Sequence, residues 1–104
     1  MERIAFRMKL HEGQKETYKL RHEQLWPELK ALLKQAGIEE YSIFLDETTL
    51  YLFGFYKIAD PALRGELPNH PVMKKWWSFM KDIMDTNEDH SPVSLPLEEV
   101  FYLP

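Results

Sequence analysis

The sequence predicts an α+β domain in which two helices cover one face of a four-stranded antiparallel sheet. Segments with period-two alternation of apolar residues and segments with helical spacing follow one another in the order βαββαβ. The second and third strands are separated by a short turn, which favours an antiparallel hairpin. The 104 residues contain no repeat and no linker, so we expect a single domain over residues 1–104.

The first strand is expected at residues 3–10, where the inward positions of the alternation are Ile4, Phe6, Met8 and Leu10. Helical spacing then runs over residues 14–36, and Gly37 is suited to the position after a helix end. Pro27 lies inside this segment and cannot donate the hydrogen bond of an interior helical residue. We therefore expect a break just before Pro27, with Pro27 starting a second helical segment.

Residues 40–45 form the second expected strand, with Tyr41, Ile43 and Leu45 on one face. Residues 46–49 are a turn, in which Asp and Thr side chains can bond to their own backbone. The third strand, residues 50–58, is apolar on both faces. The connector over residues 59–69 has room for one short turn of helix.

Pro71 suits the first turn of a helix that we expect to run to about Met84. A loop over residues 86–96 and a fourth strand over residues 97–103, again apolar on both sides, complete the chain. This order is that of a ferredoxin-like arrangement. Both helices would lie on one face of the sheet, so the apolar side chains of the other face need cover. We therefore expect a homodimer that packs sheet against sheet.

The composition excludes several classes of partner and site. The formal charge of −4 argues against nucleic acid and against an anionic membrane as the main partner. The absence of cysteine excludes a disulfide, a thiol nucleophile and a thiolate metal site. The histidines lack metal-ligand spacing and the four glycines are scattered, so neither a metal-binding motif nor a phosphate-binding loop is expected. Neither a signal peptide nor a membrane-length apolar segment is recognised, and a cytoplasmic location is expected.

The stretch from Tyr18 to Leu29 concentrates the candidate chemistry. Tyr18, His22 and Trp26 are four residues apart and would share one face of a helix. Histidine is suited to proton transfer near neutral pH because its ordinary pKa is ~6.5. On residue spacing alone, His22 is either a hydrogen-bonded core histidine or a catalytic group, and the first is the more common case. Trp26 and Pro27 are expected to pack and to redirect the helix.

The Trp76-Trp77 pair is the second candidate. Neighbouring residues on a helix point about 100° apart, so one tryptophan should lie in the core and the other at its margin. Marginal aromatic side chains line ligand pockets, and their flat apolar faces suit sugars. The alternative, favoured by spacing alone, is that both simply pack. Tyr18 and Tyr41 could add hydroxyl groups to such a pocket, although Tyr41 is equally typical of a strand aromatic at the edge of a core.

Taken together, these residues resemble the L-rhamnose mutarotase family over essentially the whole chain. No single motif is specific, but the ordered set is. It comprises Tyr18-x-x-x-His22 with Trp26-Pro27-Glu28-Leu29, Tyr41 to Asp46, Trp76-Trp77 with Met80, Asp82 and Met84, Ser91-Pro-Val93, and Glu99 to Pro104. Phe44 stands where the resemblance leads us to expect a tyrosine.

The resemblance implies a cofactor-independent isomerase, built as a dimeric α/β barrel, that interconverts the α and β pyranose anomers of L-rhamnose. By the family pattern His22 matches the proton donor, here a general acid. Tyr18, Tyr41, Trp76 and Trp77 match the substrate-binding residues. The base partner is not identified by the sequence, and both a water molecule and a tyrosine are possible.

Two other functions stay open at the level of sequence. The first is another enzyme of the same architecture, such as a cofactor-free or haem-handling monooxygenase, because a fold does not fix a function. The second is a non-catalytic sugar-binding module in which His22 is a buried core residue.

Overall fold

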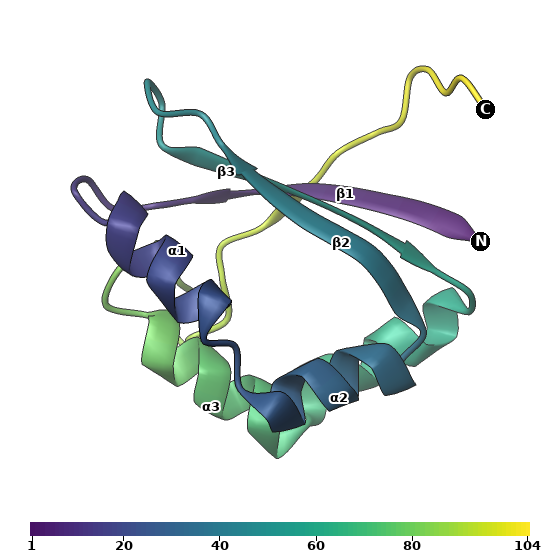
Figure 1. Cartoon of the computed structure of the whole chain (residues 1–104), viewed down its shortest axis with the longest axis horizontal. Helices are drawn as coiled ribbons and strands as arrows, with labels where there is room; N and C mark the ends of the chain where they lie inside the picture. Colours follow the sequence, from purple (N-terminus) through teal and green to yellow (C-terminus); the bar gives the residue numbers. More distant parts are fainter.

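The computed structural model describes all 104 residues, from Met1 to Pro104. The elements in chain order are β1 (Glu2–Lys9), α1 (Lys15–Glu23), α2 (Pro27–Gln35), β2 (Ile38–Leu45), β3 (Tyr51–Ile58), the 3₁₀ helix η1 (Pro61–Asn69), α3 (Pro71–Met80) and β4 (Leu95–Pro96). The four strands form one sheet in the order β2-β3-β1-β4. All the helices lie on the same side of this sheet (Figure 1), which confirms the predicted α+β fold.

The register of the sheet follows from the alternation in the sequence. β1 pairs antiparallel with β3 from Glu2 opposite Ile58 to Lys9 opposite Tyr51. β3 pairs antiparallel with β2, and a register shift between Glu39 and Ser42 interrupts that pairing. Because alternate residues share a face, the strands direct one set of side chains towards the helices. The buried members of that set are Met8, Ile38, Leu52, Tyr56 and Ile58.

The predicted break before Pro27 is present. α1 ends at Glu23 and α2 begins at Pro27, whose missing N–H costs nothing in the first turn of a helix. At the far end of α2, Gly37 has a φ of +81° and its N–H donates to the carbonyl of Lys34 at 3.0 Å. α1 and α2 are therefore two separate helices, and their axes lie at an angle to each other (Figure 1).

The connector and the third helix differ in length from the prediction. The 3₁₀ helix η1 spans nine residues, where one short turn was expected. α3 ends at Met80 rather than near Met84. The reason is that the chain after Met80 turns back to the sheet, where the N–H of His11 donates to the carbonyl of Ile83 at 2.9 Å. Met84 then forms an isolated bridge with Leu10 instead of a further helical turn.

The predicted fourth strand at residues 97–103 is wrong. β4 consists only of Leu95 and Pro96, which pair with Arg7 and Phe6 of β1. Residues 97–104, here called the C-terminal arm, leave the sheet after a last bond from the N–H of Leu97 to the carbonyl of Ala5. Arg3 of β1 contacts Glu99 and Tyr102 of the arm, but Val100, Phe101 and Leu103 stay largely exposed, Val100 at 90%. Alternating or doubly apolar patterns predict a strand only where there is a surface for them to cover.

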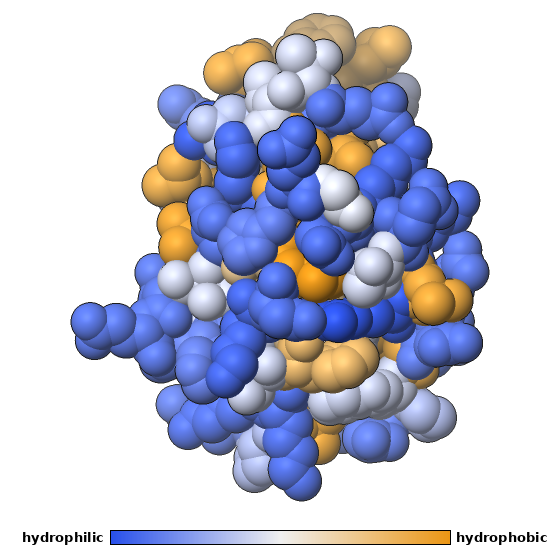
Figure 2. Space-filling view, turned by 90° about the vertical axis from the view of Figure 1, so that its left-hand side faces the viewer, coloured by the Kyte–Doolittle hydropathy of each residue, from blue (hydrophilic) through white to orange (hydrophobic).

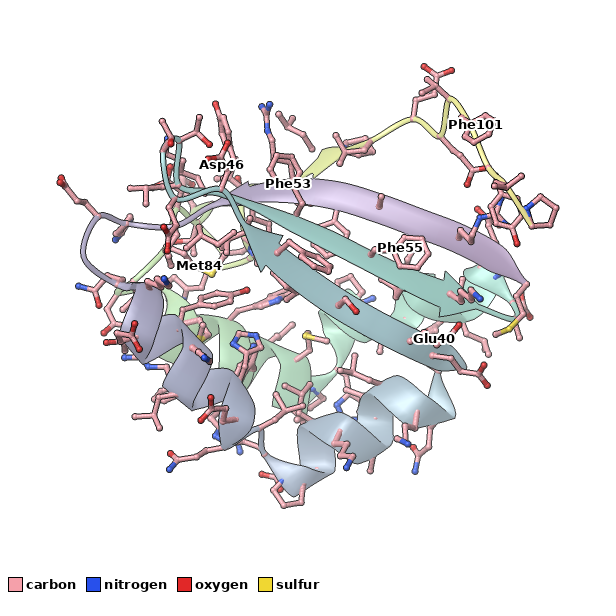
Figure 3. The ribbon with its side chains drawn as sticks, turned by 45° about the horizontal axis from the view of Figure 1, so that its top comes forward. Glu40, Asp46, Phe53, Phe55, Met84 and Phe101 are labelled. Atoms are coloured by element: carbon pink, nitrogen blue, oxygen red, sulfur yellow. The ribbon has the colours of Figure 1, made fainter.

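The face of the sheet opposite the helices carries apolar side chains that no helix covers; Phe53 and Phe55 on it are partly buried. Figure 3 shows Phe53 and Phe55 on this outer face and Phe101 on the arm beyond it. Phe44, which pairs with Phe53 across β2 and β3, is 69% exposed. The predicted arrangement, with helices on one face of the sheet and none on the other, is therefore observed within a single chain.

Candidate active site

A cavity of about 680 Å³ lies between the inner face of the sheet and helices α1, α2 and α3. This volume falls in the range typical of small-molecule sites, and the lining is predominantly apolar. All five residues singled out from the sequence line this one cavity. They are Tyr18 and His22 from α1, Tyr41 from β2, and Trp76 and Trp77 from α3.

His22 is held in one tautomer by its own helix. Its Nδ1 lies 2.9 Å from the backbone carbonyl oxygen of Tyr18, one turn earlier. A carbonyl can only accept, so Nδ1 carries the hydrogen and donates it. In the neutral ring, Nε2 is therefore the nitrogen with a free lone pair. The imidazole also stacks on the Tyr18 ring, with centroids 4.3 Å apart and planes 28° apart.

The protonation state of His22 follows from its surroundings. Burial lowers the pKa of His22 below its ordinary value, and the hydrogen bond to the Tyr18 carbonyl opposes this shift only in part. The imidazole is consequently neutral at pH 7. It is ready to accept a proton at Nε2, and once protonated it is a stronger acid than an exposed imidazolium.

The two tyrosines of the cavity stay protonated. Tyr18 is buried, and burial raises the pKa of its hydroxyl. Burial also raises the pKa of the Tyr41 hydroxyl, with a further contribution from the nearby hydroxyls of Tyr18 and Tyr56. Although 40% of Tyr41 as a whole is exposed, its ring packs 5.2 Å from that of Tyr56. A phenolate is disfavoured at both positions, so these groups can donate hydrogen bonds but are poorly suited to act as bases.

The tryptophan pair divides between core and margin, as the helical geometry predicts. Trp76 is only 7% exposed and presents its ring at 90° to that of His22, with centroids 5.4 Å apart. Trp77 is partly buried and lines the cavity. Trp26 does not line the cavity. It packs behind Trp76, with centroids 5.1 Å apart, which agrees with the packing role expected for it.

Several lining residues were not identified as site residues from the sequence. Four methionines, Met8, Met73, Met80 and Met84, form much of the apolar wall, and Lys15, Lys19 and Glu23 line it from α1. The methionines occupy inward positions that are equally typical of a closed core, so nothing in their spacing marks a cavity. The three charged residues did carry a signal, because they repeat every four residues along one face of α1.

The surface over α1 and the β2–β3 turn is mainly hydrophilic, with apolar side chains visible in the gaps between the charged ones (Figure 2). Histidine and acidic side chains nowhere form a group of three that could hold a metal ion. None of the helices combines the length and the apolar character needed to cross a bilayer.

Comparison with known proteins extends the resemblance noted from the sequence. Residues 3–103 match the family model described as L-rhamnose mutarotase. An L-rhamnose mutarotase of Formosa agariphila is 60% identical over 103 residues, which cover 99% of both chains. One of Rhizobium meliloti is 52% identical with the same coverage. A crystal structure of the Formosa agariphila L-rhamnose mutarotase is similar over 100% of both chains, with 59% identity and a TM-score of 0.93.

Proposed function

Because the chain belongs to the L-rhamnose mutarotase family, we propose that it interconverts the α and β pyranose anomers of L-rhamnose. The observation that carries this proposal is the state of His22. A neutral imidazole with a free Nε2 lines an aromatic and apolar cavity of a size suited to a monosaccharide. The cavity thus offers one proton-transfer group together with a surface for a sugar.

The reaction needs two proton movements around the anomeric carbon. A proton leaves the anomeric hydroxyl O1 as the C1–O1 bond becomes a carbonyl. In the same step the bond from C1 to the ring oxygen O5 breaks, its electron pair goes to O5, and O5 takes up a proton to become a hydroxyl. Rotation about the C1–C2 bond and closure on the other face of the carbonyl give the second anomer. No net proton is consumed and no covalent bond to the protein is formed.

In our proposal His22 performs both transfers. Its neutral Nε2 first accepts the proton of O1, and the imidazolium that results is the general acid that protonates O5. The raised pKa values of Tyr18 and Tyr41 argue against a tyrosinate as the base, which leaves the imidazole or a water molecule. A positioned acid–base group of this kind contributes ~10²–10⁴-fold to the rate.

The remaining candidates are assigned to substrate binding. Tyr18 and Tyr41 keep their protons and can donate hydrogen bonds to sugar hydroxyls. The aromatic faces of Trp76 and Trp77 offer an apolar wall to the C–H face of a pyranose. The C6 methyl group of a 6-deoxy sugar also requires apolar surroundings, and the methionines supply them.

Saturation-transfer NMR on L-rhamnose tests the proposal. Irradiation of one anomeric proton should reduce the signal of the other when catalytic amounts of the protein are present. His22→Gln should keep the fold and lower the rate by ~10²–10⁴-fold. Absence of transfer with the folded wild-type protein would contradict the activity. If His22→Gln unfolds the protein, another substitution of His22 that leaves the protein folded should be assayed. Full activity in that folded variant would show that His22 is a core residue and not the catalytic group.

A homodimer is proposed for the uncovered side of the sheet. Phe44, Phe53 and Phe55 on the outer face, with Phe101 and Leu103 on the arm, are apolar side chains that a second copy would remove from water. This would form the dimeric α/β barrel expected from the resemblance. Sedimentation equilibrium at micromolar concentration should give twice the mass of the chain, and a monomer would contradict the proposal. The cytoplasmic location stays a prediction, to be checked by cell fractionation.

A further inference from the structure

Helix α1 carries both His22 and Tyr18 but has little of its own to hold it in place. It is nine residues long, and neither end has a side-chain cap. Tyr18 is its only buried residue. Isolated helices of this length are marginal in water, so the position of α1 depends on contacts with other elements.

Arg21 supplies the most extensive of these contacts. Its Nη1 donates to the backbone carbonyl of Phe79 at 2.8 Å and to Oδ1 of Asp82 at 2.9 Å, while Nη2 donates to Oδ2 of Asp82 at 3.1 Å. The guanidinium also lies 4.3 Å from the centre of the Phe79 ring. The Arg21 side chain is 17% exposed, although Asp82 is 61% exposed.

These contacts join α1 to the end of α3, the helix that carries Trp76. The carbonyls of the last helical turn lack partners within the helix, and a cation there is favoured. Phe79 is one of these last residues of α3. The guanidinium accordingly holds the pKa of Asp82 below its usual range. Arg21 therefore satisfies a carbonyl and a carboxylate of one segment with a single planar group.

We infer that the Arg21–Asp82 pair is a positioning device that sets the place of His22 relative to Trp76. Arg21 precedes His22 directly, so the two side chains point about 100° apart, one to the end of α3 and the other to the cavity. With Arg21 fixed, α1 can neither rotate nor slide without moving the imidazole from its edge contact with Trp76. Misplacement of a reacting group by about 1 Å can cost ~10²-fold in rate. This inference rests on the proposed role of His22.

The second ion pair of α1 provides a comparison. Lys15 pairs with Glu47 of the β2–β3 turn, but both side chains are more than half exposed. Exposed pairs of this kind contribute little, typically 0–1 kcal/mol. Glu47 does not line the cavity, although its partner Lys15 does, so Glu47→Gln removes the charge pair of α1 while every lining side chain keeps its identity. It is the matched control for the Arg21 variants.

The experiment compares Arg21→Lys, Asp82→Asn, the double variant and Glu47→Gln. A lysine keeps the charge but cannot make the planar two-bond contact. We expect kcat to fall by at least about tenfold in both single variants, with KM changed by less than about threefold, because positioning rather than binding is lost. The double variant should be no slower than the slower single variant, since both remove one contact. Glu47→Gln should match the wild type.

Two further measurements distinguish a loss of positioning from a loss of stability, and test the positioning of His22 independently of the proposed activity. Thermal unfolding should show that the variants are folded at the assay temperature. The NMR signals of the His22 ring should shift or broaden in Arg21→Lys and stay unchanged in Glu47→Gln. This measurement does not depend on activity, so it tests the positioning of His22 even if the wild type shows no anomeric exchange. Wild-type kcat in folded Arg21→Lys and Asp82→Asn, an equal loss in Glu47→Gln, or unchanged His22 signals would overturn the inference.

Discussion

Gly54 leaves no room for a Cβ atom beside Phe6, and its replacement by alanine tests how Tyr41 is supported. Gly54 of β3 pairs directly with Phe6 of β1, and both face the core. A Cβ atom at position 54 would lie 2.3 Å from Cζ of Phe6 and 2.7 Å from both Cε atoms. The ring cannot yield freely, because it makes edge contacts with Tyr41 at 6.2 Å and Tyr56 at 6.1 Å between centroids.

The expected cost of Gly54→Ala combines two opposing terms. Overpacking of a core typically costs ~1–3 kcal/mol. Replacing glycine by alanine recovers ~0.4–1 kcal/mol by restricting the unfolded chain. The difference between the two terms spans about 0–2.6 kcal/mol. Because the contacts with the Phe6 ring are far below van der Waals distance, we expect the free energy of unfolding to fall by about 1–2 kcal/mol, a decrease in Tm of roughly 4–16 °C for a domain of this size. Displacement of Phe6 should also move Tyr41 and raise KM for the sugar.

Urea unfolding at a fixed protein concentration measures the first effect, and the anomeric exchange assay measures the second. Gly65→Ala is the matched control, because nothing lies within 4 Å of a Cβ atom there, and it should leave stability nearly unchanged. Phe6→Leu removes the clashing ring atoms, so its effect and that of Gly54→Ala should be non-additive by ~0.5–3 kcal/mol. Stability of Gly54→Ala within about 0.3 kcal/mol of the wild type, or full additivity with Phe6→Leu, would refute the reasoning.

Three further predictions concern the cavity. Tyr18→Phe keeps the stacking on His22 but removes a hydroxyl, and KM should rise about 2–10-fold, the equivalent of one hydrogen bond, as steady-state kinetics would show. Trp77→Leu should raise KM while Tm changes little, because Trp77 is only partly buried; a large loss of Tm would show that it is mainly a core residue. Because burial lowers the pKa of His22, the acid limb of kcat/KM should have its midpoint below the ordinary ~6.5. As pH falls below ~6.5 the unfolded state protonates first, so stability should decrease until the folded pKa is reached, and His22→Gln should abolish that part of the pH dependence in urea titrations.

The order of elements and the break before Pro27 could be predicted because they depend on local rules. Alternation, helical spacing and the chemistry of proline act within a few residues of one another. The fourth strand could not be predicted in the same way. Residues 97–103 have the composition of a strand, but whether they join the sheet depends on a surface elsewhere in the chain or in another copy. The early end of α3 is a similar case, because the pairing of Leu10 with Met84 decides it.

The candidate site was predictable to the extent that it lies on regular elements. Because α1 and α3 are regular helices, sequence spacing determines how Tyr18 lies relative to His22 and how Trp76 lies relative to Trp77. The tautomer of His22 depends on a bond to a backbone carbonyl, which no side-chain pattern reveals. The contact between Arg21 and Asp82 joins residues 61 positions apart and likewise has no local signature.

The break between Glu23 and Pro27 separates two short helices that contribute differently to the core and to the cavity. α2 adds Leu29 to the core, with less than a tenth of it exposed, and its other apolar residues pack against the same core. α1 adds only Tyr18 to the buried core. Its other cavity residues are Lys15, Lys19, His22 and Glu23, and its Arg21 contacts the end of α3. Substitutions at Lys19 and Glu23, which line the cavity but are not buried, can thus alter which sugars are accepted while the melting temperature stays nearly constant. For directed evolution of this scaffold, a library confined to Lys19 and Glu23 should retain a high proportion of folded members.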